Sequence, residues 1–89
     1  MLDPDDVKKR IETALPGSEV QVRDLTGTGD HFEATVVSPD FSGKGMVEQH
    51  QMVYAPLREV IASGALHALA LKTYSPEQWE KAAARPRSR

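Results

Sequence analysis

The chain has 89 residues, of which 39% are hydrophobic and 27% are charged, a balance typical of one small globular domain. It contains no cysteine, so it can form no disulfide and can supply no thiolate to a zinc or iron–sulfur site. No run of about 18 apolar residues occurs, and the N-terminus has no apolar leader segment. We therefore expect a soluble, cytoplasmic protein with no membrane contact.

The distribution of charge disfavours nucleic acid as a partner. The formal net charge is −2, but Arg85, Arg87 and Arg89 lie among the last five residues. The rest of the chain carries eight basic and thirteen acidic residues, whereas proteins that bind phosphate backbones depend on lysine and arginine. We expect one domain over residues 1–84, followed by a disordered basic tail at 85–89.

The first third of the chain predicts a helix and then a β-strand. Asp3-Pro4 is a helix-start pattern, with an acidic cap and a proline at the first helical position. The apolar residues that follow repeat every four residues, at Val7, Ile11 and Leu15. From Glu19 the apolar period changes to two residues, as in a half-buried strand.

A second strand is expected after the turn-rich loop at residues 26–30. Phe32, Ala34 and Val36 occupy one face of this strand, and His31 lies on the other face, where the loop enters the strand. The two strands together predict a β-hairpin. Further along, the turn residues around Phe41 predict a short helical turn.

The second half predicts a helix, a strand and a last helix. Residues 46–62 form the principal helix, with a bend expected at Pro56 because proline removes a backbone hydrogen bond. Its expected apolar face consists of Met46, Val53, Leu57, Val60 and Ile61. Residues 65–73 predict a third strand, and Ser75-Pro76-Glu77-Gln78 is a capping-box pattern for the last helix. The expected fold is α+β, in the order α-β-β-α-β-α, with a three-stranded mixed sheet covered by helices on one face.

No catalytic motif is found. The chain has no GxSxG, HExxH, P-loop or Rossmann glycine pattern, and the glycines at residues 27 and 29 precede a strand, where a phosphate cradle would precede a helix. Gly43-Lys44-Gly45 before the principal helix is a weak phosphate signal, and a helix-entry turn is the better explanation for it. We expect no enzymatic activity.

The three histidines are the candidate ligands. His50 lies beside the apolar stripe of the principal helix, and we interpret it as a partly buried structural residue. His67 alternates with Leu69 and Leu71, and the residues between them are apolar too, so its strand is expected to be the most buried of the sheet. The residues alone therefore favour a packed core histidine at position 67. A metal ligand at a strand end remains the alternative for both His67 and His31.

Two stretches of the sequence resemble the BolA family. VVSPDFSGKGMVEQHQMVY is similar to the family's VVS-x-x-F-x-G-K pattern and the helix after it, and HALALKTYSPEQW is similar to its last strand and cap. The resemblance extends from about Asp6 to Trp79 and implies a class II KH-like fold. It also implies a non-enzymatic partner of monothiol glutaredoxins, which shares a [2Fe-2S] cluster in iron homeostasis.

In such a heterodimer, glutaredoxin and glutathione supply the thiolates. The resemblance implies that His67 is one ligand from this chain and that a residue of the hairpin loop is the second. That loop residue is a cysteine in one branch of the family and a histidine in another, so a chain without cysteine resembles the histidine branch, with His31 at this position. No cofactor is expected in the isolated protein.

Two other readings stay open. The KH-like fold allows a DNA-binding regulator of stress responses, although residues 42–46, Ser-Gly-Lys-Gly-Met, lack the GXXG of KH domains. A homodimeric interaction domain with neither role is the third reading.

Overall fold

The computed structural model describes residues 3–27 and 31–84. Thr28, Gly29 and Asp30 of the expected hairpin loop and the basic tail at 85–89 lie outside the described residues. The elements are, in chain order, α1 (Pro4–Ala14), β1 (Glu19–Asp24), β2 (His31–Val37), the 3-10 helix η1 (Pro39–Phe41), α2 (Met46–Tyr54), the 3-10 helix η2 (Ala55–Leu57), α3 (Arg58–Ala62), β3 (Ala68–Tyr74) and α4 (Pro76–Ala84). The predicted element order and the α+β class are confirmed.

The sheet is mixed, and β2 is its central strand. β1 pairs with β2 in antiparallel register, and β3 pairs with β2 in parallel register. The expectation that β3 would be the most buried strand is wrong, because β3 lies at an edge. Its second apolar face consists of Ala68 and Ala70, which are exposed and small enough to face solvent at little cost.

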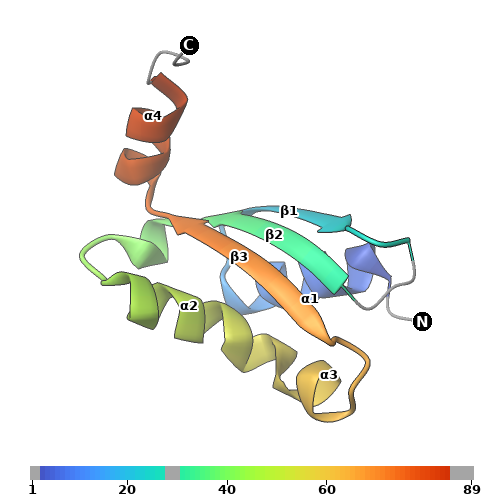
Figure 1. Ribbon diagram of the computed structural model, residues 1–89. Coiled ribbons are helices and arrows are strands. Elements are labelled where there is room, and N and C mark those ends of the chain that lie inside the picture. The colour runs from blue at the N-terminus through green and yellow to red at the C-terminus, as the bar shows by residue number, and fades with distance from the viewer. Residues whose placement is uncertain (1–2, 28–30, 85–89) are drawn as a thin grey trace.

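Helices cover one face of this sheet and leave the other face open. Figure 1 shows α1, α2 and α3 on the same side, whereas α4 extends away from the end of β3. In β2, Phe32, Ala34 and Val36 are fully buried under the helices, and the residues between them lie on the open face. Among the described residues, no helix is both long and apolar enough to cross a bilayer.

The hydrophobic core lies between the covered face and the three helices. Its buried members are Val7, Ile11, Leu15, Val20, Phe32, Val36, Phe41, Val53, Leu57, Val60 and Leu66. α1 begins as predicted, because the Asp3 side chain accepts a hydrogen bond from the backbone N–H of Asp5 at 2.9 Å. Phe41 of η1 is fully buried, so the predicted helical turn places its one large apolar side chain in the core.

One helix with a bend at Pro56 is expected over residues 46–62, and the structure interrupts it there, giving α2, η2 and α3. Its buried stripe differs from the prediction at both ends. Met46 is 69% exposed and Ile61 is 42% exposed, whereas Gln49, one turn before Val53, is only 3% exposed. Helical spacing alone does not predict whether an apolar residue of the stripe is buried in the core or lies at the exposed margin.

Gln49 is buried because its side chain replaces water with protein hydrogen bonds. Its Nε2 donates to the backbone carbonyl of Lys44 at 2.9 Å and of Phe41 at 3.3 Å. Its Oε1 accepts from the Thr73 hydroxyl at 2.7 Å. One amide therefore connects the loop before α2, the helix itself and β3.

The predicted capping box at the start of α4 is confirmed. The Ser75 hydroxyl accepts from the backbone N–H of Gln78 at 3.2 Å, and the Gln78 side chain accepts from the backbone N–H of Ser75 at 2.9 Å. Ser75 directly follows β3 and Gln78 lies in the first turn of α4, so this reciprocal cap fixes where the last helix leaves the sheet.

Candidate functional site

His31 is held at the base of the β1–β2 hairpin. Its backbone carbonyl accepts a hydrogen bond from the N–H of Leu25 at 2.8 Å, which continues the strand pairing by one step. The Asp24 carboxylate accepts from the N–H groups of Thr26 at 3.2 Å and Gly27 at 2.9 Å, so the chain turns immediately after β1. Because Phe32 is in the core, the His31 side chain projects from the open face, where it is half-buried.

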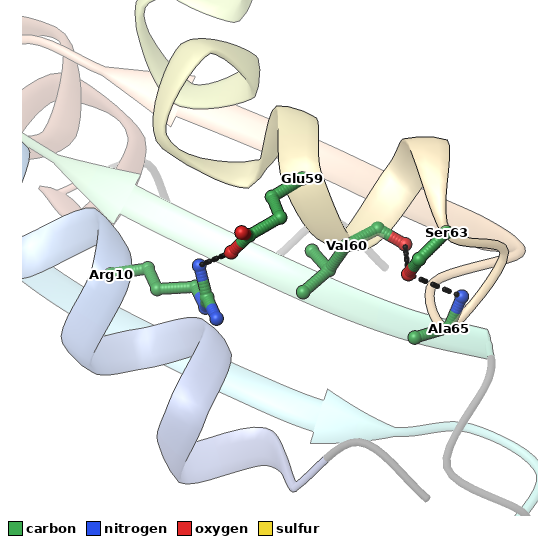
Figure 2. Close-up of polar contacts among 5 residues, drawn as sticks. All are labelled: Arg10, Glu59, Val60, Ser63 and Ala65. Carbon is green, nitrogen blue, oxygen red and sulfur yellow. Dashed lines mark hydrogen bonds and ion pairs between the residues drawn. The ribbon is translucent and has the colours of Figure 1, made fainter.

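His67 is positioned by the turn that follows α3. Figure 2 shows the Ser63 hydroxyl, which donates to the Val60 carbonyl at 3.2 Å and accepts from the N–H of Ala65 at 3.3 Å. Gly64 has a φ of +82°, a conformation that residues with a side chain rarely adopt. Leu66 is then anchored in the core, 4% exposed, and its N–H donates to the Val60 carbonyl at 3.0 Å.

His67 follows this anchor directly, and it is exposed. It precedes β3, which begins at Ala68, and is not inside the strand as predicted. The interpretation of His67 as a core histidine is therefore wrong. The physical reason is that the alternation of the strand begins only at Ala68, and the buried side chain before the strand is that of Leu66.

The fold brings the two histidines together. In the parallel register of β2 and β3, His31 is the partner of Ala68, which is the residue after His67. The two imidazole rings lie 6.1 Å apart between centroids, with their planes inclined at 74°. His50, by contrast, packs edge-to-face against Tyr54 on α2, with ring centroids 6.5 Å apart, in keeping with the structural role expected for it.

The spacing of His31 and His67 is compatible with a shared metal. Imidazole nitrogens bind metals at about 2.0–2.1 Å, so two rings on one tetrahedral ion have centroids on the order of 5 Å apart. The observed separation of the ring centroids, 6.1 Å, is slightly larger than this. A modest rotation of one of the two side chains would close the difference. Within residues 3–27 and 31–84, no group of three or more His, Cys, Asp or Glu side chains is arranged to hold a metal. The pair can therefore supply only part of a ligand set.

The surface next to His67 is apolar. A shallow pocket of about 190 Å³ is lined by Tyr54, Ile61, Leu66, His67, Ala68 and Leu69. Tyr54 and Ile61 are 37% and 42% exposed, so both present part of their apolar surface to solvent beside His67. The prediction placed Ile61 in the core, and the exposed position of α3 makes it part of the rim of this pocket instead.

An ion-pair network lies on the open face close to His31. The Glu33 carboxylate accepts from the Arg23 guanidinium at 2.6 Å and lies 3.8 Å from the Lys72 ammonium group. The hydrogen bond from Arg23 is the main cause that lowers the pKa of Glu33, with the charges of Arg23 and Lys72 acting in the same direction. This network crosses all three strands beside the histidine pair.

The glycine–lysine turn before α2 does not present a phosphate cradle. The Glu48 carboxylate accepts a hydrogen bond from the N–H of Gly45 at 3.4 Å, so the helix start already has an anionic group of its own. Gly43 has a φ of +78°, as a helix-entry turn requires. The structural role suggested for this segment therefore accounts for its residues.

Comparison with known proteins agrees with this architecture. Residues 7–78 match the family described as BolA-like protein. The chain belongs to the BolA-like family. The prediction made from the two sequence stretches is confirmed, and so is the fold expected from it.

Several BolA-like proteins resemble this chain over most of its length. Acid stress protein IbaG of Escherichia coli K12 is 34% identical over 80 residues, which cover 90% of this chain and 92% of IbaG. Protein BOLA2 of Arabidopsis thaliana is 35% identical over 82 residues, covering 90% and 86% of the two chains. The structure of a bolA protein homologue from Coxiella burnetii superposes with a TM-score of 0.76 at 40% identity, covering 90% of this chain and 99% of the homologue.

Proposed function

We propose that this BolA-like protein is a non-enzymatic binding partner of a monothiol glutaredoxin and shares a [2Fe-2S] cluster with it, in iron–sulfur cluster and iron homeostasis. His67 and His31 are the ligands from this chain. The observation that carries the proposal is their 6.1 Å ring separation at one end of the sheet, with His67 exposed and His31 half-buried. A histidine pair in this position is accessible to a group held by another protein.

The division of ligands follows from composition. This chain has no cysteine, so the thiolates would come from the glutaredoxin and from glutathione. A bound [2Fe-2S] cluster supplies one-electron redox chemistry, and its potential rises when histidine replaces thiolate ligands. The role of this chain is to hold two imidazole groups at the end of the sheet where β2 and β3 begin. Since two ligands are too few to hold a cluster, the isolated protein is expected to bind none.

The surface around the histidines suits a protein partner. The apolar pocket formed by Tyr54, Ile61 and Leu69 adjoins His67, and burying it would add a hydrophobic contact beside the ligands. Glu33, with its ion pairs to Arg23 and Lys72, lies two residues from His31 along β2, on the same face. An apolar centre with a paired polar margin is typical of protein–protein interfaces.

The test is anaerobic reconstitution with a monothiol glutaredoxin, iron, sulfide and glutathione, followed by size-exclusion chromatography, visible absorption and circular dichroism. A heterodimer is expected whose cluster spectrum differs from that of the glutaredoxin homodimer. The His67→Ala and His31→Ala variants are expected to shift the spectrum back, and His50→Ala is the matched control. Failure to form a heterodimer, or identical spectra for all four chains, would contradict the proposal.

A further inference from the structure

A second cavity lies at the other end of the sheet, where α4 leaves it. It has a volume of about 290 Å³ and lies between the first turn of α4 and the ends of β1 and β2. Its walls are formed by Glu19, Val37, Pro39, Pro76, Trp79 and Glu80. A smaller cavity of about 20 Å³ shares Glu19, Val37 and Trp79 and continues along the open face to Gln21 and Thr35. We call the two together the Trp79 groove.

The Trp79 groove combines an aromatic ring with negative charge. The indole of Trp79 is 37% exposed and is held edge-to-face against Tyr74, with ring centroids 5.2 Å apart. Glu19 and Glu80 both line the cavity, and neither forms an ion pair with another residue that the structure describes. A proline on either side adds apolar wall without a backbone N–H donor.

No described basic side chain neutralises these carboxylates. Lys81 is adjacent to Glu80 on α4, but among the described residues it forms no ion pair with Glu19 or Glu80. Lys72, the partner of Thr35 in the strand register, has its ammonium group 3.8 Å from Glu33, in the direction of His31. The groove therefore presents two carboxylates and one aromatic face to a ligand from outside. Such a surface repels polyanions and favours a cation.

We propose that the Trp79 groove binds an arginine side chain from a basic segment of a partner protein. A guanidinium group is planar, so it can stack on the indole while its N–H groups donate to Glu19 and Glu80. An ammonium group can do only one of these well. The extension of the groove to Gln21 and Thr35 offers amide and hydroxyl groups to the peptide that carries the arginine.

The groove is separate from the histidine pair. β2 runs from His31 to Val37, and a strand of this length spans about 20 Å. His31 lies at one end of it and the Trp79 groove at the other, so a protein bound at the histidines would leave the groove accessible. The proposal does not depend on a cluster or on glutaredoxin, and its test contains neither.

The test uses the full chain and the fluorescence of Trp79, which is the only tryptophan in the sequence. The probe is the blocked peptide acetyl-Pro-Arg-Pro-Arg-amide, and the control peptide has citrulline in place of arginine. We expect a saturable shift of the emission with the arginine peptide and at least about fivefold weaker binding of the citrulline peptide. Equal binding of the two peptides, or no saturable change, would overturn the proposal.

Variants distinguish the groove from general attraction between opposite charges. Glu19→Gln and Glu80→Gln are each expected to weaken binding by about five- to tenfold, and Glu12→Gln on α1, with the same change of net charge, by less than about twofold. Equal effects of all three variants would contradict the proposal. A full-length chain with Arg85, Arg87 and Arg89 changed to Gln is expected to bind as the wild type does. If that chain bound the arginine peptide severalfold more tightly than the wild type, the groove would be assigned to the protein's own tail instead.

Discussion

The imidazole rings of His31 and His67 lie 6.1 Å apart because β2 and β3 pair in parallel, with His31 opposite Ala68. The first residue of β2 carries one ring, and the residue before β3 carries the other. Because of this strand pairing, two histidines far apart in the sequence lie side by side at one end of the sheet, where their nitrogens can bind the same group. We therefore expect substitutions of these histidines to affect ligand binding and the stability of the fold separately.

His67→Ala is expected to leave the free energy of unfolding unchanged within about 0.5 kcal/mol, because the side chain is exposed and lies before the strand. Urea unfolding followed by far-ultraviolet circular dichroism measures this. A loss of several kcal/mol would show that the side chain contributes to the core after all, and its proposed role as a ligand would lose its main support.

Gln49→Leu is expected to destabilise the fold by about 1–3 kcal/mol. The substitution leaves the Lys44 carbonyl and the Thr73 hydroxyl without the partners that the buried amide supplies. The measurement is urea unfolding beside His50→Leu, the adjacent residue on the same helix, whose side chain is only half-buried. An equal or smaller effect for Gln49→Leu than for His50→Leu would contradict the role assigned to Gln49.

Glu33→Gln is expected to change how stability depends on pH. The hydrogen bond from Arg23 lowers the pKa of Glu33 in the folded state, so the unfolded chain takes up this proton more readily. The stabilisation is therefore present above the ordinary glutamate pKa of 4.5 and is lost as the pH falls through the lowered pKa.

The difference in melting temperature between wild type and Glu33→Gln should consequently be largest near neutral pH and shrink below about pH 4.5. Thermal unfolding from pH 3 to pH 8 measures it, with Glu12→Gln as the control. A difference that stays constant over this range would contradict the assignment.

Gly64→Ala is expected to cost about 1–2 kcal/mol, because the φ of +82° is strained for a residue with a side chain. Nothing lies within 4 Å of the added Cβ, so the cost comes from the backbone alone. Gly64→Asn is expected to cost less, since asparagine tolerates this conformation better than alanine does. Chemical denaturation of the three chains tests the order, and a variant with asparagine less stable than the one with alanine would be inconsistent with it.

Local patterns in the sequence predicted most of the fold. The Asp3 cap, the alternation that places Phe32 in the core, the break at Pro56 and the Ser75 capping box all depend on neighbours within a few residues. Each of these signals acts within one helix or strand, so it can be read without the position of the other elements.

The errors arise where a second element decides the outcome. Whether Ala68 and Ala70 face a helix or solvent depends on whether helices cover that face of the sheet, and alanine is compatible with both. Met46 and Gln49 lie three residues apart on α2, and the helical period alone would bury the apolar Met46. Gln49 is buried instead because its amide donates a hydrogen bond to a carbonyl group of the preceding loop. The Trp79 groove likewise depends on the direction in which α4 leaves the sheet.

The sequence predicted which residues form the candidate site, but it did not predict how exposed they are or how far apart they lie. The resemblance to the BolA family pointed to His67 and His31, whereas periodicity alone placed His67 in the core. The ring separation depends on the register between β2 and β3, which no local pattern contains. The apolar pocket beside His67 could have been suspected from Tyr54 and Ile61, since both are large apolar residues near the end of a helix stripe.

The central claim is that both histidines of this chain bind the shared cluster, and pulsed electron paramagnetic resonance of the reduced heterodimer tests it most directly. The BolA-like chain is labelled with ¹⁵N, and the glutaredoxin and glutathione are left unlabelled. We predict couplings from two ¹⁵N imidazole nitrogens, one of which disappears in His31→Ala and the other in His67→Ala, with His50→Ala unchanged. A cluster-containing heterodimer with no ¹⁵N imidazole coupling from the labelled chain would contradict the claim.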